Sequence, residues 1–514
     1  MRNAHAVAEV RTAESALMAR LPEGALMQRA ASGLAAACAG LLARAARPPG
    51  TPATRGVYGS RVVVLAGSGD NGGDALHAGA RLAARGAVVT AIAAGSRVHE
   101  GGTSALLSSG GRLIEASDDR ARPAIAAADL VIDGLLGIGG RGGLRDPGAW
   151  LAAAAERSRG LVVAVDLPSG IDADTGEAAG AAVQADVTVT FGTWKPGLLI
   201  DPGASHAGVV ELVDIGLGRY LGLPAVAAAQ AADIAAWMPR PTAESDKYRR
   251  GVLGIVAGSD RFTGAAQLSV GAAVRGGAGM VRLVSAPPAA AVVRQRWPEA
   301  VITTTGDTTG GQVIKAAGQV QAWVAGPGMG TGEPAAELLA AVLGTSLPVL
   351  VDADGITVLS AHRGLLSRSA PTLLTPHAGE LARLLGADRA DIESRRLQYA
   401  TQAAAELGCT VLLKGSTTVI ASPAGGHPVM VNPTGTSWLA TAGSGDVLSG
   451  LAGALLAQGL DPLRAAAAGA YLHGIAARLA AEGAPIGASD VIGALPAAIR
   501  TVAGVQDRQA ITCG

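Results

Sequence analysis

The sequence predicts an α/β protein whose strands form parallel sheets. Short β-branched runs alternate with Ala-rich helical segments, and nearly every run ends in Gly, Asp or Pro. The chain has 514 residues, more than one hydrophobic core usually organises, so we expect two domains. Because binding sites in such sheets lie at the carboxyl ends of the strands, the residues that follow each run are the first candidates for function.

Five strands are predicted in the first half of the chain, at 61–67, 87–95, 129–137, 160–170 and 185–192. The first of them runs into the glycine-rich loop GSGDNGGD and then into a helix. A loop of this composition lets the backbone approach a charged ligand, and its place between strand and helix favours a phosphate or a ribose. A tight connection without any ligand is the alternative.

Seven strands are predicted in the second half, at 251–259, 280–286, 322–328, 348–354, 372–377, 409–415 and 417–422. Between the halves, Pro239 and Pro241 precede the charged run DKYRR, which indicates the entry to a second domain. We therefore expect domains at 1–224 and 225–514, with the boundary uncertain by about ten residues.

Charge and cysteine content narrow the classes of function. The chain carries 41 basic and 41 acidic residues, so no net field gathers polyanions and nucleic acid is not the expected partner. The three cysteines, Cys38, Cys409 and Cys513, have spacings that fit neither a disulfide framework nor a zinc site. We expect a reducing, cytoplasmic compartment.

The apolar composition does not predict a membrane protein. Hydrophobic residues make up 49% of the chain but aromatic residues only 3%, so Ala, Val and Leu in packed elements supply most of them. The most apolar helices are predicted at 34–47 and 447–458, below the length that spans a bilayer. The N-terminal segment mixes Glu and Arg among its apolar residues and has no signal-peptide core.

Carboxylates close two strands of the first half. Asp133 ends LVIDG, and Asp166 ends LVVAVD with Ser169 just beyond it. Both acids should therefore lie at one rim of the sheet. Asn71, Asp133 and Ser169 offer oxygen ligands suited to a monovalent cation, while Asp166 is available as a base. The alternative for Asp166 is a turn or helix-capping residue before Pro168.

The stretch 437–457, SWLATAGSGDVLSGLAGALLA, is the most informative of the second half. A turn of small residues ends in Asp446 and opens into an apolar helix, so backbone N–H groups and the positive helix end point at an anion. Gly443, Ser444 and Gly445 supply the donors and Asp446 the base of a phosphoryl-transfer site. The alternative is that Asp446 only caps the helix.

Four further positions of the second half are candidates. Ala265 begins the helix after GSDRFTG, where a nicotinamide ring could lie, and Gly328 in GPGMG permits close approach of a ligand. His377 in TPHAGE can donate to a phosphate or a carboxamide, although a strand-end histidine is as often structural. Lys414 in KGSTT fits nucleotide phosphates or ribose, the alternative being a solvated lysine on an edge strand.

Taken together, these motifs resemble the YjeF family. Over roughly 10–215, the NGGD loop, the Asp before LLG and the strand end DLPSG are similar to those of NAD(P)H-hydrate epimerases. The second half resembles the ribokinase-like dehydratases that repair hydrated NADH and NADPH. The resemblance implies an N-terminal Rossmann-like three-layer sandwich and a C-terminal ribokinase-like α/β domain.

For the first half, the resemblance implies that Asn71, Asp133 and Ser169 bind potassium and that Asp166 exchanges the proton in epimerisation. Asp166 would also contact the substrate. Two positions depart from the family pattern, Asp70 for the usual Asn and Ala75 for a common Gly. The remaining substrate-binding residues implied are Asp70, Asn71, Gly72, Gly73, Asp74, Gly137, Ile138, Gly139, Gly140, Arg141, Gly142 and Gly143.

For the second half, the resemblance implies that ADP or ATP, with magnesium, phosphorylates the C6 hydroxyl of the hydrate and that phosphate then leaves. The departures are Ala378, Ser444 and Trp438. The residues implied to contact the hydrate are Ala265, Gly328, His377 and Asp446. Those implied to contact the adenine nucleotide are Lys414, Gly415, Ser416, Thr417, Thr418 and Gly445.

The sequence thus predicts a cytoplasmic, homo-oligomeric, bifunctional repair enzyme that acts on NADHX and NADPHX with an adenine nucleotide. One alternative is a ribokinase-class kinase of a small alcohol, fused to a non-catalytic Rossmann-like module; TPHAGE and the fused first half argue against it. Another is an N-terminal half that only binds or scaffolds, against which Asp133 and Asp166 speak. The preferred nucleotide and the preferred hydrate remain open.

Overall fold

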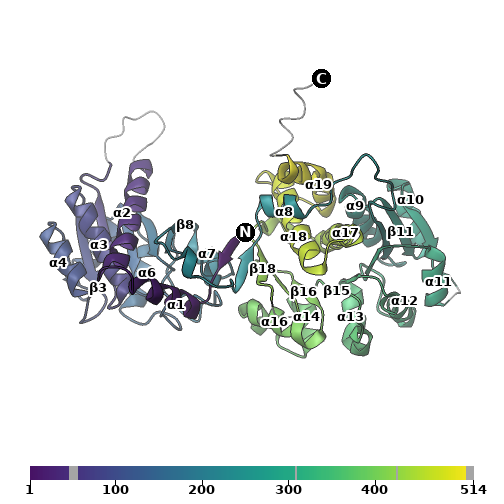
Figure 1. Cartoon of the computed structure of the whole chain (residues 1–514), viewed down its shortest axis with the longest axis horizontal. Coiled ribbons are helices and arrows are strands. Elements are labelled where there is room, and N and C mark those ends of the chain that lie inside the picture. The colour runs from purple at the N-terminus through teal and green to yellow at the C-terminus, as the bar shows by residue number, and fades with distance from the viewer. Residues whose placement is uncertain (46–55, 307–308, 424–425, 505–514) are drawn as a thin grey trace, which may run out of the picture. The chain divides into compact units, whose positions relative to one another are not determined.

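Each of two units in the chain has its own sheet (Figure 1). The computed structural model describes residues 1–45, 56–306, 309–423 and 426–504. By their internal contacts, Asn3–Val226 form one unit, and Met1–Arg2 with Ala227–Gly514 form the other. Cys513 and the last two residues of the helix predicted at 34–47 lie outside the described residues.

The sheet of the N-terminal unit has seven strands in the order β4-β3-β2-β5-β6-β7-β8. All neighbouring strands run parallel. The order reverses between β2 and β5, as in doubly wound Rossmann-like sheets, and the crevice at this reversal is where such folds bind ligands. The strands are β2 (Arg61–Ala66), β3 (Val88–Ala93), β4 (Arg112–Glu115), β5 (Leu130–Gly134), β6 (Leu161–Val165), β7 (Val187–Phe191) and β8 (Val209–Val213).

Helices cover both faces of this sheet. Successive strand residues point to opposite faces, so Val62 and Val64 pack with one set of helices and Val63 and Leu65 with another. The first set is α1 (Val7–Met18), α2 (Ala25–Ala45), α3 (Asp70–Ala84) and α4 (Glu100–Ser108), and the second is α5 (Ala121–Ala126) and α6 (Gly148–Glu156). Short α7 (Gly203–Ala207) follows β7. The predicted three-layer sandwich is confirmed.

The sheet of the C-terminal unit has eleven strands in the order β1-β9-β18-β17-β16-β15-β14-β13-β10-β11-β12. From β12 to β16 neighbouring strands are parallel, but β16, β17 and β18 pair antiparallel. The strands are β1 (Arg2–Ala4), β9 (Val226–Ala228), β10 (Val252–Val256), β11 (Met280–Ser285), β12 (Val301–Thr304), β13 (Ala322–Ala325), β14 (Val349–Val351), β15 (Thr372–Leu374), β16 (Thr410–Leu413), β17 (Thr418–Ala421) and β18 (Val429–Asn432).

The antiparallel end corrects the expectation of purely parallel sheets. Only residues 414–417 connect β16 to β17, and so short a link can join antiparallel strands but cannot make a parallel crossover. The candidate nucleotide segment KGSTT is therefore a tight turn at the carboxyl end of β16.

Helix α17 (Ser444–Ala457) is buried along its length from Val447 to Ala457 and packs against α9 (Thr263–Arg275) and α18 (Pro462–Ala481). A helix enclosed in this way is apolar on every side, as the sequence shows. The other helices are α8 (Ala231–Trp237), α10 (Pro287–Arg296), α11 (Gly310–Ala317), α12 (Glu333–Leu343), α13 (Ala353–Ala361), α14 (Ala378–Leu385), α15 (Arg389–Ser394), α16 (Arg396–Leu407) and α19 (Ala488–Ala503).

Helix α2 is longer than predicted. The expected helix at 34–47 begins at Ala25, and its window Ala25–Arg44 is, by length and composition only, the one candidate membrane span among the described residues. Half of this window is buried within the protein, and Leu34 and Cys38 belong to the core. The prediction that this helix falls below spanning length was wrong, because its first two turns carry polar residues that masked its start.

Candidate functional sites

The three predicted potassium ligands meet at the carboxyl edge of β5. Ser169 Oγ lies 2.7 Å from Asp133 Oδ1 and 3.0 Å from the carbonyl oxygen of Leu136. Asn71, in the first turn of α3, donates from Nδ2 to the same carbonyl at 3.1 Å. Side chains from three segments therefore surround one backbone turn at the point where the strand order reverses.

This group is rich in oxygen and contains a single carboxylate. Asp133 is fully buried, and burial raises its pKa to about 6 even though hydrogen bonds from Ser169 and Leu135 favour the charged form. A bound cation would offset the buried charge. Across the described residues, His, Cys, Asp and Glu side chains form no group of three or more that could hold a metal ion. The donor set fits a monovalent cation better than a divalent one.

Asp166 follows β6 in the left-handed backbone region, with φ at 64°. Its Oδ1 accepts hydrogen bonds from Thr190 Oγ1 at 3.0 Å, from Phe191 N at 3.1 Å and from Lys195 Nζ. These partners lie at the end of β7 and just beyond it, so in the described part of the chain the carboxylate is held across the sheet edge rather than by the turn before Pro168. The orientation of Asp166 is therefore fixed by tertiary contacts.

Lys195 is the cationic partner that sequence reasoning missed. It is 1% exposed, and its Nζ also donates to Thr190 Oγ1 at 3.0 Å and to the carbonyl oxygen of Phe191 at 3.1 Å. The residue stands in FGTWKPGLL, but no pattern of spacing links it to Asp166. The signal available in the sequence was a single lysine within an otherwise apolar segment. Such a segment is expected to be buried, and a lysine is almost never fully buried unless it is paired.

A cluster of acids surrounds Asp166. Burial and then the charge of Asp166 raise the pKa of Glu14, and the pKa of Asp74 is raised by burial, Asp166, Asp70 and Glu14. Asp74 Oδ1 is buried and has no hydrogen-bond partner among the described residues. Asp70 and Asp74 were predicted to contact substrate, whereas Glu14 was not, because it lies outside the glycine-rich loops and strand ends that carried the predictions.

The two predicted glycine-rich loops touch each other. A Cβ added to Gly137 would lie 3.1 Å from the side chain of Asn71, and one on Gly139 would lie 3.0 Å from Arg11. Gly72 has no room for a side chain, since its Cβ would come within 2.2 Å of the carbonyl oxygen of Gly67. The remaining members of this predicted pocket lie on the same two segments: Gly73 in α3, and Ile138, Gly140, Arg141, Gly142 and Gly143 after β5.

The second site is built on the first turn of α17. Gly443 precedes the helix with φ at 85°, and Asp446 follows in the first turn. Burial, and then the charge of Asp352, raise the pKa of Asp446 to about 7. A group with such a pKa can take up a proton in neutral solution, which an ordinary aspartate cannot do efficiently.

Lys414 reaches this turn from the end of β16. Its Nζ lies 2.7 Å from Asp352 Oδ1 and 3.8 Å from Glu380 Oε2, and a Cβ on Gly445 would lie 3.4 Å from it. Burial alone would lower the pKa of Lys414, but the two carboxylates raise it. Because β16 lies inside the sheet and the ammonium is paired, the alternative of a solvated lysine on an edge strand is wrong.

His377 caps α14 and lies beside Lys414. Its Nδ1 accepts from Gly379 N at 3.0 Å and from Glu380 N at 3.3 Å, so the proton of the neutral ring sits on Nε2. Burial lowers the pKa of His377. The backbone N–H of Lys414 donates to the Pro376 carbonyl at 2.8 Å, which joins the two predicted segments. His377 therefore has a structural role, and its Nε2 also lies 3.4 Å from Glu380 Oε1.

Small residues face each other nearby. Gly328 has φ at 59°, and a Cβ there would lie 2.8 Å from the Cβ of Ala265. At the nucleotide turn, the guanidinium of Arg396 lies directly over Gly415, because a Cβ there would come within 1.8 Å of Arg396 Nη1. The other predicted members of this turn are Ser416, which is exposed, Thr417, which is buried, and Thr418, which begins β17.

Two further buried residues belong to this site and were not predicted. Asp352 is 1% exposed and follows β14; its Oδ2 accepts from Ser449 Oγ of α17 at 2.7 Å. His473 of α18 is bonded to the backbone of Ser444, and burial lowers its pKa to about 4. Asp352 closes the predicted strand PVLVDAD, so the strand-end rule that found Asp133 could have found it too.

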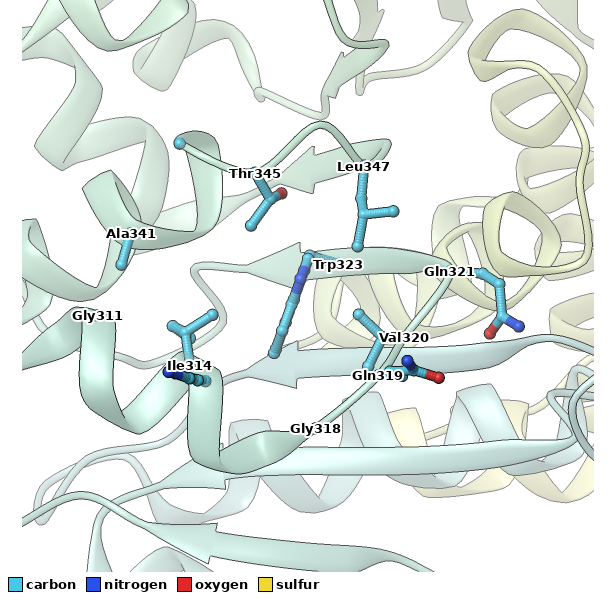
Figure 2. A pocket seen from close by; sticks show the side chains of 12 residues that line it. Gly311, Ile314, Gly318, Gln319, Val320, Gln321, Trp323, Ala341, Thr345 and Leu347 are labelled. Carbon is cyan, nitrogen blue, oxygen red and sulfur yellow. The ribbon is translucent and has the colours of Figure 1, made fainter.

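A groove of about 770 Å³ lies elsewhere in the C-terminal unit, away from both groups of predicted residues. Figure 2 shows Trp323 of β13 standing between Ile314 of α11 and Leu347. Its walls come from the ends of α11 and α12 and from the segments that enter β13 and β14. These are the amino ends of the strands, opposite the edge that carries Asp352 and Lys414.

Two α/β units each place carboxylates at the carboxyl edge of the sheet, which is where enzymes of the α/β class carry their active sites. Residues 23–197 match the family model described as YjeF-related protein N-terminus, and residues 253–494 match that described as NAD(P)H-hydrate dehydratase. A bifunctional NAD(P)H-hydrate repair enzyme of Mycobacterium tuberculosis is 49% identical over 469 residues, covering 91% of this chain and 92% of that protein. The chain belongs to the family of bifunctional NAD(P)H-hydrate repair enzymes.

A second relative carries the same protein name. The bifunctional NAD(P)H-hydrate repair enzyme of Mycobacterium leprae is 48% identical over 487 residues, which are 94% of each chain. Among solved structures, an ADP/ATP-dependent NAD(P)H-hydrate dehydratase from Bacillus subtilis, co-crystallised with ATP and Mg²⁺, is 28% identical. It covers 53% of this chain and 97% of its own, with a TM-score of 0.46.

Proposed function

We propose that residues 1–224 interconvert the R and S forms of NADHX and NADPHX and that residues 225–514 dehydrate the S form. Dehydration consumes ADP or ATP and yields AMP or ADP and phosphate. The observation that carries this proposal is the first turn of α17, where Asp446 has a pKa of about 7 beside the ammonium of Lys414. Membership of the repair-enzyme family supports both activities.

In the dehydratase site, the N–H groups of the first turn of α17 and the Lys414 ammonium hold the terminal phosphates of the nucleotide. Asp446 takes the proton of the C6 hydroxyl as that oxygen attacks the terminal phosphorus and the nucleotide leaves one phosphate shorter. The C6 phosphate then departs with loss of a ring proton, which restores the dihydropyridine. Ala265 and Gly328 leave room for the nicotinamide ring.

Magnesium is expected to arrive on the nucleotide. No set of three or more acidic, histidine or cysteine side chains in the described residues could hold a metal ion. Mg²⁺ commonly keeps several waters and is bound largely through substrate phosphates. We therefore assign it to the nucleotide and to no side chain.

In the epimerase site, Asp166 removes and returns a proton during interconversion at C6, held in place by Lys195. Potassium on Asn71, Asp133 and Ser169 would supply positive charge beside a substrate that carries phosphates. The glycine-rich loops after β2 and β5 let the backbone approach that substrate. The half-buried acids around Asp166 are further proton carriers at this edge.

A coupled assay tests both activities. Mixed R- and S-NADPHX is incubated with the protein and ADP, then ATP, and the absorbance of the reduced nicotinamide is followed. We expect all of the hydrate to be consumed, with inorganic phosphate released in equal amount. Conversion of the S form alone would refute the epimerase. No return of absorbance with either nucleotide would refute the dehydratase, and a stable phosphorylated alcohol in place of free phosphate would favour the small-molecule kinase.

The same assay with NADHX gives the preferred hydrate. Assembly as a homo-oligomer and a cytoplasmic location remain predictions from the sequence. Sedimentation of the purified protein measures the first, and fractionation of cells measures the second.

A further inference from the structure

Asp352 is a buried carboxylate whose two oxygens bind two different elements. Oδ1 accepts from Lys414 Nζ at 2.7 Å and Oδ2 accepts from Ser449 Oγ at 2.7 Å. Asp352 is 1% exposed and Ser449 is fully buried. A carboxylate buried in this way is costly unless it is paired and hydrogen-bonded, so these three side chains form one unit that ties β14 and β16 to α17.

This unit fixes the position of the Lys414 ammonium. A lysine side chain has a flexible four-carbon stem and does not keep a single conformation by itself. A Cβ on Gly445 would lie 3.4 Å from Lys414 Nζ and 3.7 Å from Asp352 Oδ2. Ser449 lies one turn beyond Gly445 on the same helix. Because Asp352 binds both Ser449 and Lys414, it holds the ammonium at the first turn of α17.

We propose that Asp352 is a positioning residue of the dehydratase site: it holds Lys414 at the first turn of α17 and places a negative charge beside Asp446. The inference rests on the proposed function, in which Lys414 binds nucleotide and Asp446 is the base. It assigns Asp352 a role that is exerted through Lys414 and Asp446.

The charges around Asp446 determine the direction in which Asp352 shifts the pKa of Asp446. Burial contributes most to the raised pKa of Asp446, and Asp352 contributes more than the other charges. Lys414 opposes it, while Asp354 of α13 and Glu380 of α14 add to it. Removing the charge of Asp352 should therefore lower the pKa of Asp446. The base works when deprotonated, so the rate of dehydration falls at low pH as Asp446 takes up a proton. This acid limb of the pH–rate profile should therefore move to lower pH in the variant.

Three substitutions separate charge from position. Asp352→Asn keeps the size of the side chain and an oxygen for Lys414 but removes the charge; we expect the acid limb of kcat for S-NADPHX to move to lower pH. Ser449→Ala keeps the charge but frees the carboxylate from α17; we expect a several-fold higher KM for ADP with the limb unmoved. Asp352→Ala loses both, and the KM for ADP should rise about tenfold or more, as for a lost charged hydrogen bond.

Asp354→Asn is the matched control, because it removes a neighbouring carboxylate whose effect on Asp446 is smaller; its limb should move less than that of Asp352→Asn. If the acid limb lies at the same pH in Asp352→Asn and in the parent, the charge of Asp352 does not raise the pKa of Asp446, and this part of the proposal is overturned. An unchanged KM for ADP in both Ser449→Ala and Asp352→Ala overturns the positioning role.

Calorimetric titration of parent and Asp352→Ala with ADP keeps the inference testable without turnover. Weaker ADP binding in the variant supports positioning, and equal binding contradicts it. A parent that binds ADP but returns no NADPH refutes the proposed function instead, so the two failures are distinguishable. Thermal unfolding of Asp352→Asn beside the parent shows whether the substitution has damaged the fold; in that event Ser449→Ala and the titration decide.

Discussion

The two proposed catalytic carboxylates each lie among acids and near one lysine, but they differ in their direct partners. Asp166 makes a direct ion pair with the buried Lys195, and three donors converge on one of its oxygens. The charges of Asp352, Asp354 and Glu380 raise the pKa of Asp446, and Lys414, the cation that opposes them, is paired with Asp352. The first site holds its carboxylate by an ion pair and hydrogen bonds. The second raises the pKa of its carboxylate, first by burial and then by the like charge of Asp352.

The difference suits the two reactions. A hydroxyl gives up its proton only to a base with sufficient affinity for it, and a pKa of about 7 lets Asp446 accept that proton and still be charged in neutral solution. Epimerisation at C6 needs a base that takes a proton and returns it after the ring opens or loses hydroxide, and the contacts of Asp166 fix the direction from which that base approaches. The comparison teaches that the same residue type is adapted by its neighbours rather than by its own motif.

The largest expected effect comes from Asp446→Asn. Loss of a positioned base usually costs on the order of 100- to 10,000-fold in rate, so dehydration of S-NADPHX should collapse while R-to-S conversion continues. Calorimetry should still detect ADP binding, since the donors of α17 remain. Asp461→Asn is the control, because that side chain caps α18 and an amide caps nearly as well. Retained turnover in Asp446→Asn would mean that Asp446 only caps its helix.

Asp166→Asn should give the mirror result. We expect enzymatic epimerisation to slow by about 100-fold, with dehydration of purified S-NADPHX unaffected. The observable loss is limited by spontaneous epimerisation, which a blank without protein measures. If the variant consumes the R form at the parent rate after this correction, the assignment of Asp166 fails.

Lys195→Met tests whether the ion pair supports the N-terminal unit. Breaking a buried pair leaves an uncompensated charge and costs about 3–5 kcal/mol, so β6 and β7 should exchange amide hydrogen faster while β13 and β14 do not change. Hydrogen exchange followed by mass spectrometry gives both regions in one experiment. Lys315→Met, at an exposed lysine, should leave exchange as in the parent. Unchanged protection of β6 in Lys195→Met would show that the pair contributes little.

The pH dependence is the smallest effect and sharpens the comparison. With a pKa of about 7 for Asp446, kcat for dehydration should rise through neutrality and level off above it. The fraction of charged base, and with it the rate, should differ by about tenfold between pH 6 and pH 8. Steady-state rates on S-NADPHX at saturating ADP measure this. A dehydration rate that is flat across this range would contradict the raised pKa.

Much of the fold and part of each site could be predicted from local pattern. Every strand expected from a β-branched run is present, and strand-end or helix-start position alone singled out Asp133, Asp166 and Asp446. The omitted strands include β4, β8 and β12, whose residues are largely exposed or half-buried. Such strands carry polar side chains and resemble loops in sequence, because only one face or neither is covered.

The sequence by itself determined the α/β class, the positions of the glycine-rich turns and the acids that close buried strands, because these depend on residues close together in the chain. Only the tertiary structure decided which groups pair: Lys195 with Asp166 across 29 positions, and Ser449 with Asp352 across 97. Strand order and helix packing bring such residues together, and burial then determines how strongly they interact. Neither effect can be read from the spacing of residues along the chain.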